Sequence, residues 1–158
     1  MLMINNIKVA IIAFAGGVSF GAVTVYVLIQ NGLLVGAFLI APYPFLNDTW
    51  DLIAFLFPHG VIELLAICIS GGAGLMLGWS LIAPGNLSRI DSLRKASLDA
   101  LPLFGGVVIM LIVAAIIESF VARTGVPREL KLSVAALTAI GMVFYFGCAG
   151  RDQGCQVK

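Results

Sequence analysis

The stretch PHGVIELLAICISGGAGLMLG, residues 58–78, decides the fold. It is an apolar run with five glycines, and two polar residues, His59 and Glu63, lie near its start. The apolar residues continue to Ile82, where Pro84 and Gly85 end the run. About 20 such residues cross a hydrocarbon core of about 30 Å as a helix. The pattern therefore predicts a membrane-spanning helix over residues 61–82.

Composition agrees with a membrane environment for the rest of the chain. Hydrophobic residues make up 61% of the 158 residues and charged residues only 11%, against about 25% charged residues in an average soluble domain. The length predicts a single membrane domain over residues 1–158. The net charge of +1 and the lack of basic runs alternating with aromatic residues exclude nucleic acid as a partner.

Three further spans are predicted on either side of this helix, and the fold class is an all-α, polytopic membrane bundle. The apolar runs predict these spans over residues 7–29, 101–122 and 130–148. Gln30-Asn31-Gly32 is expected to end the first span, because Asn and Gly readily adopt the left-handed conformation that ends a helix.

Two apolar segments are too short to span and are predicted to be half-helices. They cover residues 33–41 and 50–57, with prolines between and after them. Such a pair is typical of a re-entrant or interfacial hairpin that is buried in protein, with Pro58 and Gly60 as a helix break. Residues 88–98 begin with a capping-box pattern at Ser88 and predict an amphipathic surface helix.

Small residues recur every fourth position on the predicted 61–82 span. Ala66, Ser70, Gly74 and Gly78 lie on one helix face, which is the pattern of membrane helices that pack with their backbones close together. The same spacing occurs at Gly17 and Gly21, and again at Gly32 and Gly36. Packing within the chain and packing between chains both fit this pattern.

The distribution of Lys and Arg predicts the orientation in the cell membrane. Cytoplasmic loops carry more of these residues than loops on the other side. The larger group comes together when the N-terminus, the loop 84–100 and the C-terminus are cytoplasmic, which leaves Arg123, Arg128 and Lys131 on the outer side.

This topology is expected to bring His59, Glu63 and Glu118 together near the outer boundary. His59 and Glu63 are four residues apart on one helix face. Buried carboxylates normally pair or face water, so one interpretation is a structural polar clasp, in which Glu118 pairs with Arg123, Arg128 or Lys131. The alternative is a metal or proton site, because imidazole and two carboxylates form a possible ligand set. No catalytic residue, metal or cofactor is predicted.

The segments NNIKVAIIAFAGGVSFG (5–21), NGLLVGAF (31–38), PHGVIELLAICISGGAGLMLG (58–78) and IIESFV (116–121) resemble, in order and spacing, the stage II sporulation protein M family. The resemblance covers nearly the whole chain. It implies a multi-pass membrane scaffold without catalytic activity that works with partner proteins. Members usually carry another membrane segment and a soluble region before the stretch that begins here at Asn5, which implies either a short form or a larger partner that supplies this part.

Two functions from different classes follow. The first is a non-enzymatic scaffold that packs against other membrane proteins, in a larger complex or as a homo-oligomer within the lipid bilayer. The second is a small transporter or channel component that uses the polar residues His59, Glu63 and Glu118 as a binding site. An intramembrane metalloenzyme ranks below both, because no separate general base is visible.

Overall fold

The computed structural model describes residues 2–40, 49–122 and 127–148, and these residues form helices without any strand. The elements are α1 (Leu2–Ala15), η1 (Gly16–Ser19), α2 (Ala22–Ile40), α3 (Thr49–Ile82), α4 (Arg89–Ile117), the π-helical turn η2 (Glu118–Ala122) and α5 (Arg128–Cys148). Four segments are long and apolar enough to cross a membrane, namely Ala22–Ile40, Gly60–Ile82, Arg89–Phe120 and Arg128–Cys148. The predicted all-α, multi-pass membrane architecture is confirmed.

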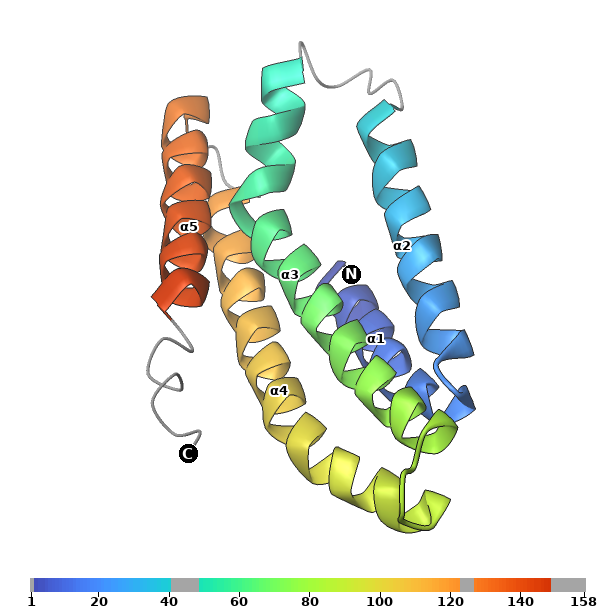
Figure 1. The fold of residues 1–158 in the computed structure, drawn as a ribbon. Helices are drawn as coiled ribbons and strands as arrows, with labels where there is room; N and C mark the ends of the chain where they lie inside the picture. Colours follow the sequence, from blue (N-terminus) through green and yellow to red (C-terminus); the bar gives the residue numbers. More distant parts are fainter. Residues whose placement is uncertain (1, 41–48, 123–126, 149–158) are drawn as a thin grey trace.

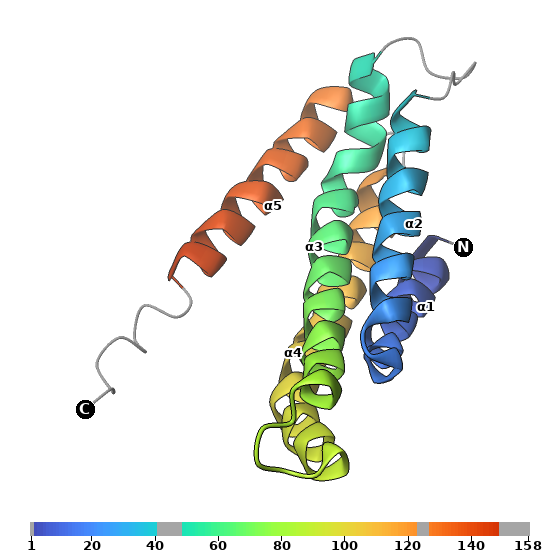
Figure 2. The same ribbon diagram turned by 45° about the vertical axis from the view of Figure 1, so that its right-hand side comes forward.

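Helix α3 is the centre of the bundle and contacts α1, α2, α4 and α5 (Figure 1). From α2 to α5 the long helices alternate in direction, and α2 and α5 lie on opposite sides of α3 in this view. The short helix α1 runs alongside α3 in the same direction, and the turned view agrees (Figure 2). The N-terminal helix thus packs against α2, α3 and α4.

The first reversal of the chain lies at residues 16–21, so the predicted single helix over 7–29 is wrong. Phe20 and Gly21 have φ angles of 58° and 83°, a conformation that glycine adopts without strain. The Ser19 hydroxyl donates to the Gly16 carbonyl at 2.6 Å and accepts from the Val23 amide at 2.9 Å. These bonds satisfy backbone groups that the turn removes from the regular helix pattern.

The expected break at Gln30-Asn31-Gly32 is absent, because α2 continues through these residues to Ile40. An uninterrupted helix satisfies every backbone group internally, which matters most where lipid offers no hydrogen bonds. The expected half-helix 33–41 is therefore the C-terminal part of α2 up to Ile40. Residue 41 and the prolines at 42 and 44 lie outside the described residues.

Helix α3 is also longer than predicted, because it passes through Pro58 and Gly60 without ending. The expected half-helix 50–57 is its first part. Proline removes one backbone hydrogen bond, but membrane helices tolerate this loss when neighbouring groups compensate. The predicted helix break at Pro58 and Gly60 is therefore wrong.

The amphipathic segment 88–98 is not a separate surface helix but the first part of α4, which continues through Pro102. Its predicted start is confirmed: the Ser88 hydroxyl accepts from the Asp91 amide at 3.2 Å and caps the helix. Leu93 and Ala96 pack against Ala73 and Leu77 of α3. This packing explains why residues 88–98 continue directly into the rest of α4. A separate helix lying flat on the membrane surface would lose these contacts.

Helix α1 begins at a different end of the bundle from the one that the expected topology gives it. Ser70 of α3 donates to the carbonyl of Ala10 at 2.6 Å, and Asn6 reaches Glu63. Helices α1 and α3 are therefore parallel, and the start of α1 points away from the turn between α3 and α4. The N-terminus and the loop 84–100 were expected on one side of the membrane, and the direction of α1 does not support this grouping.

Candidate functional site

Two carboxylates lie in the interior of the bundle and form its most unusual polar site. Glu63 of α3 is 7% exposed and Glu118, the first residue of η2, is 4% exposed. They are close enough for their charges to interact. Both belong to segments that can cross a membrane, where ionisable groups are costly and normally face protein or water rather than lipid.

Asn6 is the third member of this site, and it comes from α1. Its side chain makes a hydrogen bond with the Glu63 carboxylate; since a carboxylate only accepts, the Asn6 amide is the donor. No role for this residue was predicted from the sequence. Two consecutive amides at the start of an apolar run, Asn5 and Asn6, are the available signal, but only the parallel packing of α1 and α3 shows which carboxylate they reach.

His59 lies one helical turn before Glu63 on α3, but its side chain is outside the described residues. Its predicted contact with Glu63 therefore stays a prediction, as does the pairing of Glu118 with a basic residue of the 123–131 segment. Among the side chains that are described, no group of three or more His, Cys, Asp or Glu residues could hold a metal ion.

A local change in helix geometry places Glu118. The helix α4 ends at Ile117, and the next five residues form a π-helical turn. The Glu118 amide is shared between the carbonyls of Ala114 and Ala115, a bifurcated bond that is common at helix ends. Such turns are rare and are found frequently at functional sites, and this one lies at the contact between α4 and α3.

The small residues of α3 lie against α1 and the turn that follows it. Ala66 and Ser70 are completely buried. A Cβ atom on Gly74 would lie 2.2 Å from the Ala13 carbonyl oxygen, and a Cβ on Gly17 would overlap the Gly74 carbonyl. No other residue type fits these two positions without moving the helices apart.

Gly78 makes the same kind of approach closer to the end of α3. A Cβ atom there would lie 2.6 Å from the Gly21 amide nitrogen. In contrast, a Cβ on Gly60 would meet Leu56 at an ordinary 3.6 Å, and nothing lies within 4 Å of the position on Gly32 or Gly36. Gly17, Gly74 and Gly78 thus define the contact of α3 with α1 and the turn after it, whereas Gly32 and Gly36 of α2 leave open space.

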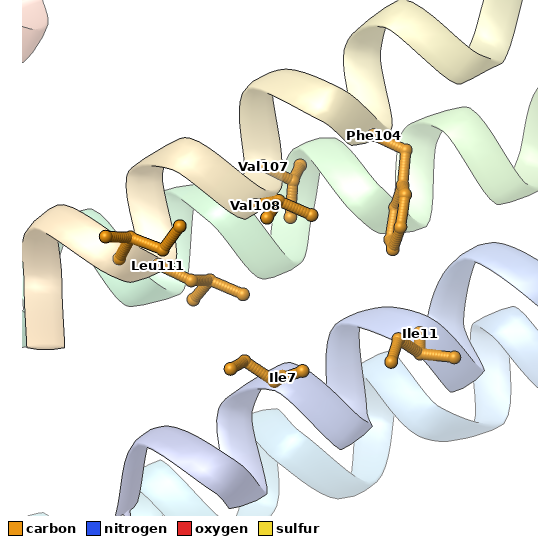
Figure 3. Close-up of a pocket in the computed structure, with 7 residues that line it drawn as sticks. Ile7, Ile11, Phe104, Val107, Val108 and Leu111 are labelled. Carbon is orange, nitrogen blue, oxygen red and sulfur yellow. The ribbon is translucent and has the colours of Figure 1, made fainter.

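An apolar pocket lies between α1 and α4 (Figure 3). Ile7 and Ile11 line it from α1, and Phe104, Val107, Val108, Leu111 and Ile112 from α4. The ring of Phe104 also stacks on Phe14 of α1 at 4.6 Å between centroids, so the two helices are in direct contact beside the pocket. The pocket contains no polar group and so cannot bind an ion.

Comparison with known proteins connects these features to one family. The family model described as "Stage II sporulation protein M" matches residues 1–123, which include α1 to α4 and all three site residues, Asn6, Glu63 and Glu118. An uncharacterized protein of the archaeon Methanocaldococcus jannaschii is 32% identical over 126 residues, 76% of this chain and 68% of the relative. No solved structure matches the chain. The chain belongs to the stage II sporulation protein M family of multi-pass membrane proteins.

Proposed function

We propose that this protein is a non-enzymatic membrane scaffold that packs against other membrane proteins. The observation that carries the proposal is the contrast between its helices. In α2 and in α5 only 6% of the membrane-spanning window is buried, against 56% in α3. Thr24 is the buried residue of α2, and Ala135 that of α5. Most of the surface of these two helices is thus available for contact with lipid or with partner proteins.

Helix α2 offers a surface suited to such contacts. Gly32 and Gly36 are one turn apart and have open space where a side chain would be. Exposed Leu33, Leu34 and Ile40 surround them. Small residues at this spacing allow another membrane helix to approach closely, and this supports the use of α2 in assembly with a partner or with a second copy.

Purification from the native membrane in mild detergent tests the proposal. We expect the chain to elute with at least one further membrane protein or as an oligomer. Gly36→Leu should release the associated protein if α2 carries the contact, and Gly105→Leu on α4, another glycine with open space, is the matched control. A monomer without any associated protein would contradict the scaffold function.

A small transporter or channel component is the second candidate, and the buried polar site favours it. Glu63, Glu118 and Asn6 come from three elements and meet inside the membrane-spanning region. Polar sites of this kind bind protons or solutes in many transporters. Reconstituted vesicles that show proton or cation flux with the wild type, and none with Glu63→Gln, would favour this function over the scaffold.

We also propose that the protein lies in the cell membrane, with a defined orientation. We place the end of the bundle with the α3–α4 turn and the C-terminal end of α5 in the cytoplasm, because Arg89, Arg94 and Lys95 are exposed near that turn. A cysteine at Asn86 should then react with a membrane-impermeant maleimide only after the cells are opened. Labelling in intact cells would reverse the orientation.

A further inference from the structure

Lys8 is an exposed charge at the middle depth of the bundle. The Thr24 hydroxyl of α2 donates to the Ala13 carbonyl of α1 at 2.7 Å, which fixes the relative height of these antiparallel helices. Lys8 precedes Ala13 by five residues and is therefore level with about residue 29 of α2. At 1.5 Å per residue it lies about 10 Å from the beginning of the Ala22–Ile40 span, and farther from its end.

The surroundings of Lys8 supply nothing to compensate this charge. Its side chain is exposed, and in the part of the chain that the structure describes it has neither an ion pair nor a hydrogen bond. The exposed side chains of Ile4, Ile11 and Ile12 surround it on the same face of α1. A lone ammonium in hydrocarbon is so unfavourable that such residues almost always pair or face water.

The apolar pocket between α1 and α4 lies beside this face. Ile11, one turn after Lys8, is one of its lining residues and points toward Phe104 and Val108 of α4 (Figure 3). The face thus combines a single positive charge with a hollow for an apolar side chain. Together they fit a helix that carries a carboxylate and, one turn away, a large apolar residue.

We propose that this face of α1, defined by Ile4, Lys8, Ile11 and Ile12, binds a transmembrane helix of another membrane protein that carries a carboxylate at the depth of Lys8. The inference rests on the proposed scaffold function and identifies its partner chemistry. A second copy of this chain is the less suitable occupant, because Glu63 and Glu118, the described carboxylates nearest this depth, are both buried.

A model peptide tests the charge requirement directly. The full-length protein is reconstituted in phosphatidylcholine vesicles with a labelled Leu/Ala transmembrane peptide that has one central Glu, and association is measured by energy transfer. We expect the Glu peptide to bind the wild type about fivefold more tightly than the same peptide with a central Ala, since interhelical polar contacts contribute on the order of this much. Lys8→Met should abolish the difference.

Charge reversal completes the experiment. Lys8→Glu should favour a peptide with a central Lys over the Glu peptide, and unchanged thermal unfolding of both variants shows that they fold. Equal binding of the Glu and Ala peptides by the wild type would overturn the proposal. Binding that appears only when phosphatidylglycerol is added would also overturn it and assign Lys8 to lipid headgroups.

A native-membrane experiment separates this proposal from the scaffold function. A photo-crosslinking residue replaces Ile12 on the proposed face or, as a control, Ile109 at similar depth on α4; both positions are exposed. We expect an adduct from position 12 that persists with Lys8→Arg and disappears with Lys8→Met. If proteins still co-purify but the adduct at position 12 is absent or independent of Lys8, the scaffold function stands and this inference fails.

Discussion

The two ends of the α1–α3 contact are held together by different physics. Near the turn after α1, the backbones of Gly17 and Gly74 touch, and there is no room for a single added carbon. About three helical turns away along α3, Asn6 and Glu63 are joined by a hydrogen bond between their side chains. The first end is fixed by shape and the second by polar satisfaction, so the two ends should respond differently to substitution.

The largest effect is expected at the glycine end. Gly74→Leu must separate α1 from α3, because its first added atom would lie 2.2 Å from the Ala13 carbonyl oxygen. We expect a loss of about 3 kcal/mol or more, toward the upper range for overpacking a tight interface. Thermal unfolding in detergent measures it. Gly72→Leu, two residues away on open surface, is the control and should be nearly neutral.

The polar end should distinguish between replacements of similar size. Glu63→Leu leaves the half-buried Asn6 amide without its acceptor, a loss of about 1–3 kcal/mol, whereas Glu63→Gln keeps an acceptor and should be milder. A proton or metal site predicts another order, with Gln as damaging to function as Leu. Equal stability of the wild type and Glu63→Leu would refute the clasp.

A double substitution sharpens the same prediction. If Asn6 and Glu63 serve mainly each other, Asn6→Leu combined with Glu63→Leu should destabilise the protein by less than the sum of the two single changes. Additive losses would instead indicate that each side chain depends on other partners, Glu118 being the first to examine.

A smaller effect is expected in the middle of the contact. Ser70→Ala removes the hydrogen bond to the Ala10 carbonyl without adding volume, so we expect a loss of about 0.5–1 kcal/mol in chemical or thermal unfolding. Ser119→Ala is the matched control, since Ser119 is exposed and donates only to Ala115 in its own helix turn. A neutral Ser70→Ala would show that shape alone holds α1 in place.

The smallest effect is expected at Gly60. A Cβ atom there makes only an ordinary contact with Leu56, and the helix passes through this residue. Gly60→Ala should therefore be neutral, or stabilising by up to about 1 kcal/mol because alanine favours the helix. Clear destabilisation would show that Gly60 does act as a break in the helix, as the sequence alone suggests.

Apolar run length was enough to predict the helical class and three spans, because the need to cross hydrocarbon is nearly independent of tertiary structure. The spans near residues 61–82, 101–122 and 130–148 all correspond to long helices. Residues that usually end helices were less reliable for predicting where the helices end. Asn31 and Pro58 are breakers in water, but both lie inside continuous membrane helices here, since an interrupted helix would leave backbone groups unsatisfied.

The candidate site was predicted in part for a similar reason. Glu63 and Glu118 stand out because a carboxylate in an apolar run is rare, and the structure brings them together. Asn6 could not be assigned, because its role depends on α1 turning back at Gly21 and lying parallel to α3. That arrangement results from the close approach of Gly17 and Gly74, a tertiary fact that no helix pattern contains.

Disulfide cross-linking in native membranes tests the parallel packing of α1 and α3 most directly. In a cysteine-free background, Ala10→Cys is combined either with Ala66→Cys, which belongs to the same buried cluster, or with Ser80→Cys near the end of α3. Parallel packing predicts rapid cross-linking of residue 10 to residue 66 and none to residue 80. A single first helix over residues 7–29, with its start beside the α3–α4 turn, predicts the reverse, and that result would contradict the account.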